Sequence, residues 1–146
     1  LNLFGNWSYI EGKFNDKDDN GNAQLYAGNR FRLTPKNSFA IGFDLNVPTS
    51  KKDSFYLRPT YSWKSKVFFE ESNEPEFTQK AYGLLNFTAG YRFQPGTVYY
   101  EIGAFGKNVL DEKYIVDAGN SGRQIGFPTY VGGSRSVVGV MVKMGF

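Results

Sequence analysis

The side chains best suited to chemistry in this 146-residue chain are clustered carboxylates, because the chain contains neither histidine nor cysteine. Asp16, Asp18 and Asn20 lie in the segment D-K-D-D-N-G, which matches the first half of a calcium-binding loop. Ala27 stands where such a loop needs its bidentate glutamate. We therefore treat Asp16, Asp18 and Asn20 as an incomplete calcium candidate and expect a solvated loop.

A second acidic group follows the centre of the chain, at Glu70, Glu71, Glu74 and Glu76. Neighbours in a strand point to opposite faces, so Glu70 and Glu71 cannot converge as an acid–base pair if the strand continues. Histidine, the commonest general base, is missing. The glycine-rich residues 119–122 and 132–133 precede no predicted helix, so we expect loops there, not a phosphate-binding turn. We expect no enzyme activity, no catalytic residue and no cofactor.

The elements that carry these residues are strands, because apolar and polar residues alternate with a period of two. The predicted strands span residues 1–14, 38–45, 55–69, 82–93, 98–114 and 134–146. The second strand could begin earlier, at residues 30–33, with Pro35 interrupting its hydrogen bonding. No segment keeps a helical period, and none approaches the roughly 18 apolar residues of a membrane helix.

The connections between these strands alternate between long and short, at residues 15–29, 47–53, 70–80, 94–97 and 117–133. In an antiparallel meander, alternate connections lie at the same end. All long connections are therefore expected at one end, as in outer-membrane barrels.

The two faces of the predicted strands differ in charge. One face is almost uncharged and carries aromatic residues towards the strand ends, as an interfacial girdle does: Trp7, Tyr9, Tyr61, Trp63, Tyr91 and Phe93. The other carries a basic row: Arg58, Lys64, Lys66, Arg92, Lys107 and Lys143. This row could line a route for anionic cargo or pair with acidic groups of another domain. The net charge of +3 is too small to indicate a nucleic-acid partner, and we expect none.

Three segments resemble motifs near the C-terminal end of TonB-dependent outer-membrane receptors. Residues 28–38 resemble the G-x-x-x-x-x-x-P-x-x-S entry into a strand, and residues 106–114 resemble N-L-F-D-x-x-Y. Residues 133–146 resemble the closing G-x-P-R…F strand, with Ser134 in place of proline. In the second motif, Val109 and Leu110 replace the usual leucine and phenylalanine.

This resemblance implies an all-β fold, an antiparallel up-and-down meander of about six strands that is part of a larger transmembrane β-barrel. Residues 1–146 would be the C-terminal portion of a TonB-dependent receptor barrel, without its plug domain and earlier strands. The basic row would then face the lumen, and Val142, Met144 and Phe146 would form the signal read by the barrel assembly machinery.

The resemblance also implies a function. The protein would be a receptor/transporter in the outer membrane of a Gram-negative bacterium. It would take up a scarce nutrient, such as an iron–siderophore complex, with energy from the inner membrane. Its partners would be outer-membrane lipid, the rest of the barrel and plug, and the TonB complex.

Two alternatives fit the same alternation of faces. One is a soluble lipocalin-like ligand-binding β-barrel, in which Phe39, Ile41, Phe43 and Leu45 would line a cavity. The other is a structural outer-membrane barrel formed by several copies of this chain.

Overall fold

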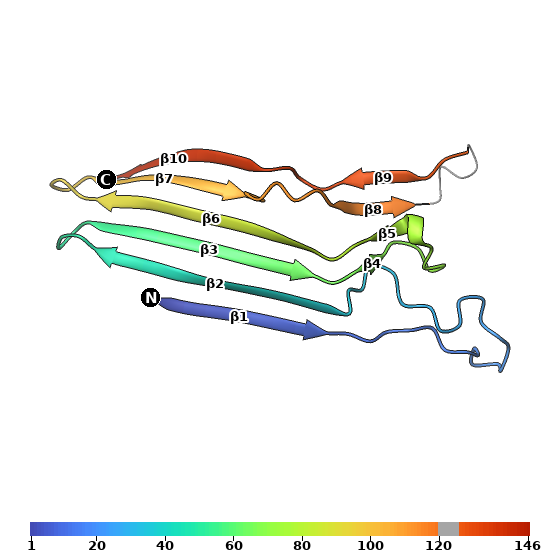
Figure 1. Ribbon diagram of the computed structural model, residues 1–146. Helices are drawn as coiled ribbons and strands as arrows, with labels where there is room; N and C mark the ends of the chain where they lie inside the picture. The colour runs from blue at the N-terminus through green and yellow to red at the C-terminus, as the bar shows by residue number, and fades with distance from the viewer. Residues whose placement is uncertain (120–125) are drawn as a thin grey trace.

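One six-stranded antiparallel sheet forms most of the computed structural model, which describes residues 1–119 and 126–146 (Figure 1). Its strands lie side by side in chain order: β1 (Asn2–Tyr9), β2 (Asn37–Pro48), β3 (Ser54–Lys64), β6 (Tyr82–Phe93), β7 (Tyr99–Lys107) and β10 (Val137–Gly145). Every neighbouring pair is antiparallel. The predicted all-β meander of about six strands is confirmed.

The long connections carry secondary structure of their own. Beyond the sheet, β4 (Val67–Phe68) pairs with β5 (Thr78–Gln79), and β8 (Ile115–Gly119) pairs with β9 (Thr129–Gly132). The short 3₁₀ helix η1 (Pro75–Phe77) lies at the acidic tip of the first hairpin. The long connection predicted at residues 117–133 is present, but Gly119 and Gly132 lie in β8 and β9 rather than in the loops expected there. The glycine-rich prediction for 119–122 lies mostly outside the described residues.

Several predicted strands end earlier than their periodicity indicated, because local hydrogen bonds redirect the chain. The first strand ends at Tyr9 rather than residue 14. The third ends at Lys64 rather than residue 69, where the Ser65 N–H donates to the Asn37 carbonyl (2.9 Å) and the Asn37 N–H to Ser65 Oγ (2.9 Å).

Left-handed backbone conformations account for two further corrections. The fifth strand ends at Lys107 rather than residue 114, because Asn108 and Asp111 have φ angles of 47° and 51°. Leu33, with φ of 56°, keeps residues 30–33 out of the second strand. The last strand begins at Val137, not Ser134.

All long connections project from one end of the sheet, and the short turns and both chain termini lie at the other (Figure 1). The main cluster of buried apolar side chains lies among the long connections, not in the sheet: Val67, Phe69, Phe77 and Ala118, with Ile115 against them. Because the sheet is a single layer, neither of its faces is covered by another sheet or helix in the described residues. Each face must therefore be covered by its surroundings.

The strand register separates the faces as the alternation predicted. Ile41 pairs with Tyr61 and Tyr61 with Leu85, and these residues define what we call the apolar face. Large side chains on this face are exposed, including Leu3, Trp7, Ile41, Ile102, Val140 and Val142. An apolar surface of this extent needs an apolar environment. The opposite side, which we call the charged face, carries Arg58, Arg92, Glu101 and Lys143.

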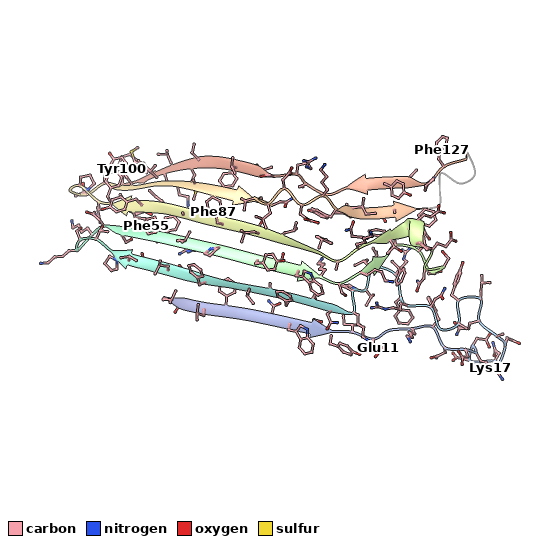
Figure 2. The ribbon with its side chains drawn as sticks, viewed as in Figure 1. Glu11, Lys17, Phe55, Phe87, Tyr100 and Phe127 are labelled. Carbon is pink, nitrogen blue, oxygen red and sulfur yellow. The ribbon has the colours of Figure 1, made fainter. Side chains whose placement is uncertain are left out.

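Aromatic side chains gather at both ends of the apolar face. At the long-loop end, the ring of Phe39 stacks on Trp63 (5.5 Å between centroids) and lies 6.0 Å from that of Tyr61. At the short-turn end, where Figure 2 labels Phe55 and Tyr100, the ring of Phe93 stacks on that of Tyr100 with 5.2 Å between centroids. From Phe55 to Trp63, β3 runs about 26 Å at roughly 3.3 Å per residue. At the 35–45° tilt of barrel strands, this length covers about 18–21 Å along the membrane normal, which fits within the apolar band of a transmembrane barrel, about 25 Å tall.

Among the described residues, no helix has the length and hydropathy needed to span a bilayer.

We predict that lysine is tolerated on one face of β2 and not on the other. Ile41→Lys puts an ammonium group on the apolar face, two residues inside the Phe39–Trp63 pair, and should cost about 1–3 kcal/mol of unfolding free energy in lipid vesicles, between the interfacial and midplane values. Ala40→Lys, one residue away on the charged face, should cost less than about 1 kcal/mol. Urea unfolding monitored by tryptophan fluorescence would measure both, and equal costs would contradict the assignment of the faces.

Candidate functional site

The charged face contains a buried carboxylate, Glu101 on β7, which is only 4% exposed. Four side chains donate hydrogen bonds to it. Tyr99 Oη (2.7 Å) and Arg92 Nε (3.0 Å) donate to Oε2, and Tyr56 Oη (2.9 Å) and Lys143 Nζ (3.4 Å) to Oε1. We call these five residues the Glu101 cluster. Because its donors come from β3, β6, β7 and β10, the cluster ties four strands together near the short-turn end.

Strand register brings these side chains together. The turn after β6 pairs Arg92 with Glu101, and the register of β10 pairs Lys143 with Glu101 from the other side. The carboxylate thus lies between two cations on adjacent strands, the favourable arrangement for a cross-strand pair.

Tyr56 is buried to 1% exposure although it lies on the face of a single sheet. In register, Tyr56 pairs with Gly90, and Gly90 with Gly103. A Cβ atom at either glycine would approach Tyr56 Oη to 2.6 or 2.8 Å, so the phenol needs these two residues to lack side chains. The guanidinium of Arg92 covers the Tyr56 ring at 4.4 Å, in cation–π geometry.

Arg58 lies beside this cluster and contacts a second acid. Its Nε is 3.0 Å from Asp44 Oδ1 and its guanidinium carbon is 5.4 Å from the centre of the Tyr56 ring. Asp44 Oδ1 is buried and accepts no hydrogen bond within the described part of the chain, so the pair is a charge contact without aligned hydrogen bonding. Both side chains are partly exposed, and such pairs contribute little to stability.

A cavity of about 550 Å³ opens on the charged face next to Arg58. Lys107 lies on its rim, and the remaining polar lining comes from Thr60, Asn86 and Thr88. Among the described residues, no acid lines this cavity and Lys107 has no ion pair. The cavity therefore offers two cations and three neutral polar groups, a lining suited to an anion.

The structure distributes the six basic candidates among different environments. Arg92 and Lys143 are held by Glu101, Arg58 lies against Asp44, and Lys107 lines the cavity. Lys64 ends β3 on the same face and lines a smaller cavity beside Tyr82. Lys66 differs, because it follows the end of β3 and its Nζ lies 4.6 Å from the centre of the Phe68 ring.

Sequence reasoning missed the acidic partners and the tyrosines of this face. It considered acids of another domain as partners of the basic row, whereas Glu101 and Asp44 belong to this chain. The predicted turn at residues 94–97 would pair Arg92 with Tyr99, whereas six residues separate the last observed pair, Phe93 and Tyr100, and this register brings Arg92 opposite Glu101. No signal in the sequence marked Tyr56, because its burial depends on glycines of two other strands.

The calcium candidate is organised by hydrogen bonds within its own loop. The Asp18 carboxylate accepts from the backbone N–H groups of Asn20 (2.9 Å) and Asn22 (2.8 Å) and from Asn22 Nδ2 (3.2 Å). These bonds, the Asn22 backbone bond foremost, hold the pKa of Asp18 below its ordinary value. In the described part of the chain, no three acidic, histidine or cysteine side chains converge on a metal position. Calcium binding by Asp16, Asp18 and Asn20 stays a prediction without structural support.

A second polar assembly joins the end of β7 to the start of β10. Asn108, 3% exposed, donates from Nδ2 to the carbonyls of Glu112 and Ser134 (both 2.9 Å) and accepts from the Glu112 N–H (2.9 Å). Asp111 accepts from Arg135 through Nε (2.8 Å) and Nη2, and from the Ser136 N–H (3.1 Å). We call this assembly the 108–136 clasp.

The clasp explains why two of the recognised motifs occur together. Residues 106–114 supply Asn108 and Asp111, and residues 133–146 supply the groups that bond to them. Tyr114 stacks on Tyr82 of β6 with 4.6 Å between centroids, and Gly133 packs closely against the Tyr114 ring. The two motifs therefore act as one unit that anchors the long connection to the sheet.

Removing the Glu101 carboxylate should destabilise the sheet. Glu101→Ala leaves Arg92 without its acceptor, and the buried phenol of Tyr56 and the partly buried phenol of Tyr99 unpaired, and should cost about 2–3 kcal/mol. Glu71→Ala, at an exposed loop position, is the control and should change stability by less than about 0.5 kcal/mol. Urea unfolding in vesicles would measure both, and an unaffected Glu101→Ala protein would contradict a stabilising role for the cluster.

The clasp should respond to acid through Asp111. The hydrogen bonds from Arg135, and then from the Ser136 N–H, hold the pKa of Asp111 far below its ordinary value. A folded pKa lowered in this way contributes stability above the unfolded value of about 3.9. That contribution shrinks as the pH falls below about 3.9 and vanishes below the folded pKa.

Proteolysis of residues 108–136 at a series of pH values would test this, with an acid-active protease at low pH and a neutral protease above it, each normalised to its rate on an unfolded substrate. The wild type should become more susceptible below about pH 4. In Asp111→Asn, susceptibility should already be high at neutral pH and should change less with acid. Parallel acid profiles for the two proteins would show that Asp111 is not the titrating group.

Comparison with known proteins agrees with this architecture. The family model described as TonB dependent receptor-like, beta-barrel, matches residues 1–109. No curated protein and no solved structure matches the chain. The family match argues against the lipocalin-like alternative, whose cavity-lining residues lie on the apolar face of the open sheet. Since the match covers more than half of the 146 residues, the protein belongs to the TonB-dependent receptor family, through its β-barrel domain.

Proposed function

We propose that this chain forms part of the barrel wall of a receptor that imports a scarce nutrient, such as an iron–siderophore complex, across the outer membrane. The observation that carries the proposal is the match of residues 1–109 to the family. The sheet agrees with it, because one of its faces is apolar and the other is charged. Proteins of this family are outer-membrane receptors and transporters of Gram-negative bacteria, not enzymes. Energy would come from the inner membrane through the TonB complex.

The open edges of the sheet support a larger assembly. In the described residues, β1 and β10 each have a paired strand on one side only. In lipid, an unpaired edge leaves backbone N–H and C=O groups without partners, at several kilocalories per mole for each group. Further receptor strands would therefore continue the sheet at both edges, and a plug domain would lie against the charged face. This reading makes residues 1–146 the C-terminal part of the barrel.

The charged face would line the lumen and handle an anionic cargo. Its cavity combines Arg58 and Lys107 with hydroxyl and amide groups, which suits carboxylate or catecholate oxygens of a metal chelate. Arg92 and Lys143 are already committed to Glu101 and would serve the wall itself. Long connections at one end would form the external vestibule (Figure 1).

The last strand would carry the signal for membrane assembly. Val142 and Met144 lie exposed on the apolar side of β10, and Phe146 follows them with 97% of its surface exposed. These side chains would be available to the barrel assembly machinery before the barrel closes and would contact lipid afterwards.

Transport should depend on the cations of the cavity. Arg58→Ser with Lys107→Ser should lower the uptake of an anionic ferric chelate by on the order of tenfold, because the attraction to the cargo is lost. Cellular accumulation of the radiolabelled chelate would measure this. Arg58→Lys with Lys107→Arg keeps both charges and should retain most of the uptake. Unchanged uptake in the serine variant, with a plug that unfolds at lower temperature, would instead indicate that these cations hold the plug.

A further inference from the structure

Two lysines face each other at the base of the β4–β5 hairpin. Lys66 and Lys80 directly flank the paired residues Val67 and Gln79. Facing like charges are unfavourable. Within the described part of the chain, neither ammonium group has an ion pair or an acceptor, and Lys66 lies over the Phe68 ring. The hairpin therefore holds two uncompensated cations side by side.

These lysines lie on the opposite side of the hairpin from the charged face. Val67 and Gln79 line a cavity together with Lys64 and Tyr82, which belong to the charged face. Successive residues in a strand point to opposite sides, so the neighbours of Val67 and Gln79 point towards the side of the apolar face.

There, a separate depression of about 340 Å³ has its own lining: Lys66, Phe68, Asn73, Pro75, Thr78 and Lys80. Among the described residues, no carboxylate lines it, although the hairpin tip is rich in glutamate. The depression is thus positively charged and large enough for a phosphate group.

Its height along the strands matches the polar layer of a bilayer. Trp63 belongs to the aromatic group at the long-loop end of the apolar face, and Lys66 follows three residues later. Three residues span about 10 Å along an extended chain, which is about 7–8 Å along the membrane normal at the 35–45° tilt of barrel strands. The headgroup layer outside the hydrocarbon core is about 5–8 Å thick on each side. The lysine pair therefore lies level with lipid headgroups, directly beyond the rings that mark the edge of the hydrocarbon.

We propose that Lys66 and Lys80 form a binding site for the phosphate group of an anionic lipid in the leaflet on the long-loop side. The two ammonium groups would share the phosphate, which relieves their mutual repulsion. The acyl chains would then run down the apolar face past Trp63 and Phe39. This site rests on the proposed orientation of the apolar face towards lipid, and it is separate from the cavity on the charged face.

Native mass spectrometry of the full-length receptor in detergent would test the site, with phosphatidylglycerol as the probe and phosphatidylcholine of the same chain length as the neutral comparison. Each lysine near an anionic lipid surface strengthens binding by about fivefold. Lys66→Gln with Lys80→Gln should therefore raise the dissociation constant for phosphatidylglycerol by on the order of twentyfold. Binding of phosphatidylcholine should not change.

A matched control lies at the short-turn end of the sheet. Lys51→Gln with Lys52→Gln removes the same charge from the short turn between β2 and β3 and should leave the dissociation constant unchanged. Lys66→Arg with Lys80→Arg should retain binding, and heat-modifiable gel mobility confirms that each variant is folded.

Three results would overturn the proposal. They are an unchanged constant in the Lys66/Lys80 variant, an equal loss in the Lys51/Lys52 control, or displacement of the lipid by millimolar inorganic phosphate, which would indicate a site for free anions. Chelate uptake in cells distinguishes this proposal from the proposed function. Loss of lipid binding in the Lys66→Gln/Lys80→Gln variant, together with normal uptake, supports the lipid site. Lipid binding by a wild-type receptor that imports no chelate contradicts only the transport proposal.

Discussion

A sheet one layer thick cannot bury its own side chains, and this constraint governs the rest of the structure. In a two-layer domain, each apolar face covers another. Here the apolar face of β1, β2, β3, β6, β7 and β10 has no covering layer in the described residues, and its side chains stay exposed. The surroundings must supply what a second layer would. Lipid meets this requirement on one side, and a polar lumen meets it on the other.

The Glu101 cluster shows how the polar side manages charge without a protein core. A carboxylate at 4% exposure is tolerated because donors from four strands surround it. Tyr56 can reach it because Gly90 and Gly103 leave the sheet surface bare under its ring. Hydrogen bonds between side chains thus join strands that backbone bonds connect only in adjacent pairs. The cluster stabilises the relative position of β3, β6, β7 and β10, and beside it lie Arg58, which contacts Asp44, and Lys107.

The described parts of the long connections pack together beyond one end of the sheet (Figure 1). Their apolar side chains, with Phe77 at the centre, make the compact core that the sheet lacks. The 108–136 clasp anchors the last of these connections, because Asn108 and Asp111 bond to both of its ends. A receptor wall of this kind combines strands held by their environment with loops held by their own packing. The lysine pair at the base of β4–β5 lies where these two parts meet.

The sequence alone determined the strands, their faces and their family, because alternation with a period of two and short turn segments are local properties of the chain. It predicted Tyr82–Phe93 with the bounds that the structure has. It could not determine where β7 ends, because the left-handed Asn108 depends on bonds to Asn86, Glu112 and Ser134. It also missed the partners of Arg92 and Lys143, since a shared acceptor appears only once three strands are in register. The tertiary structure decided which charges are neutralised within the chain and which remain available to cargo or lipid.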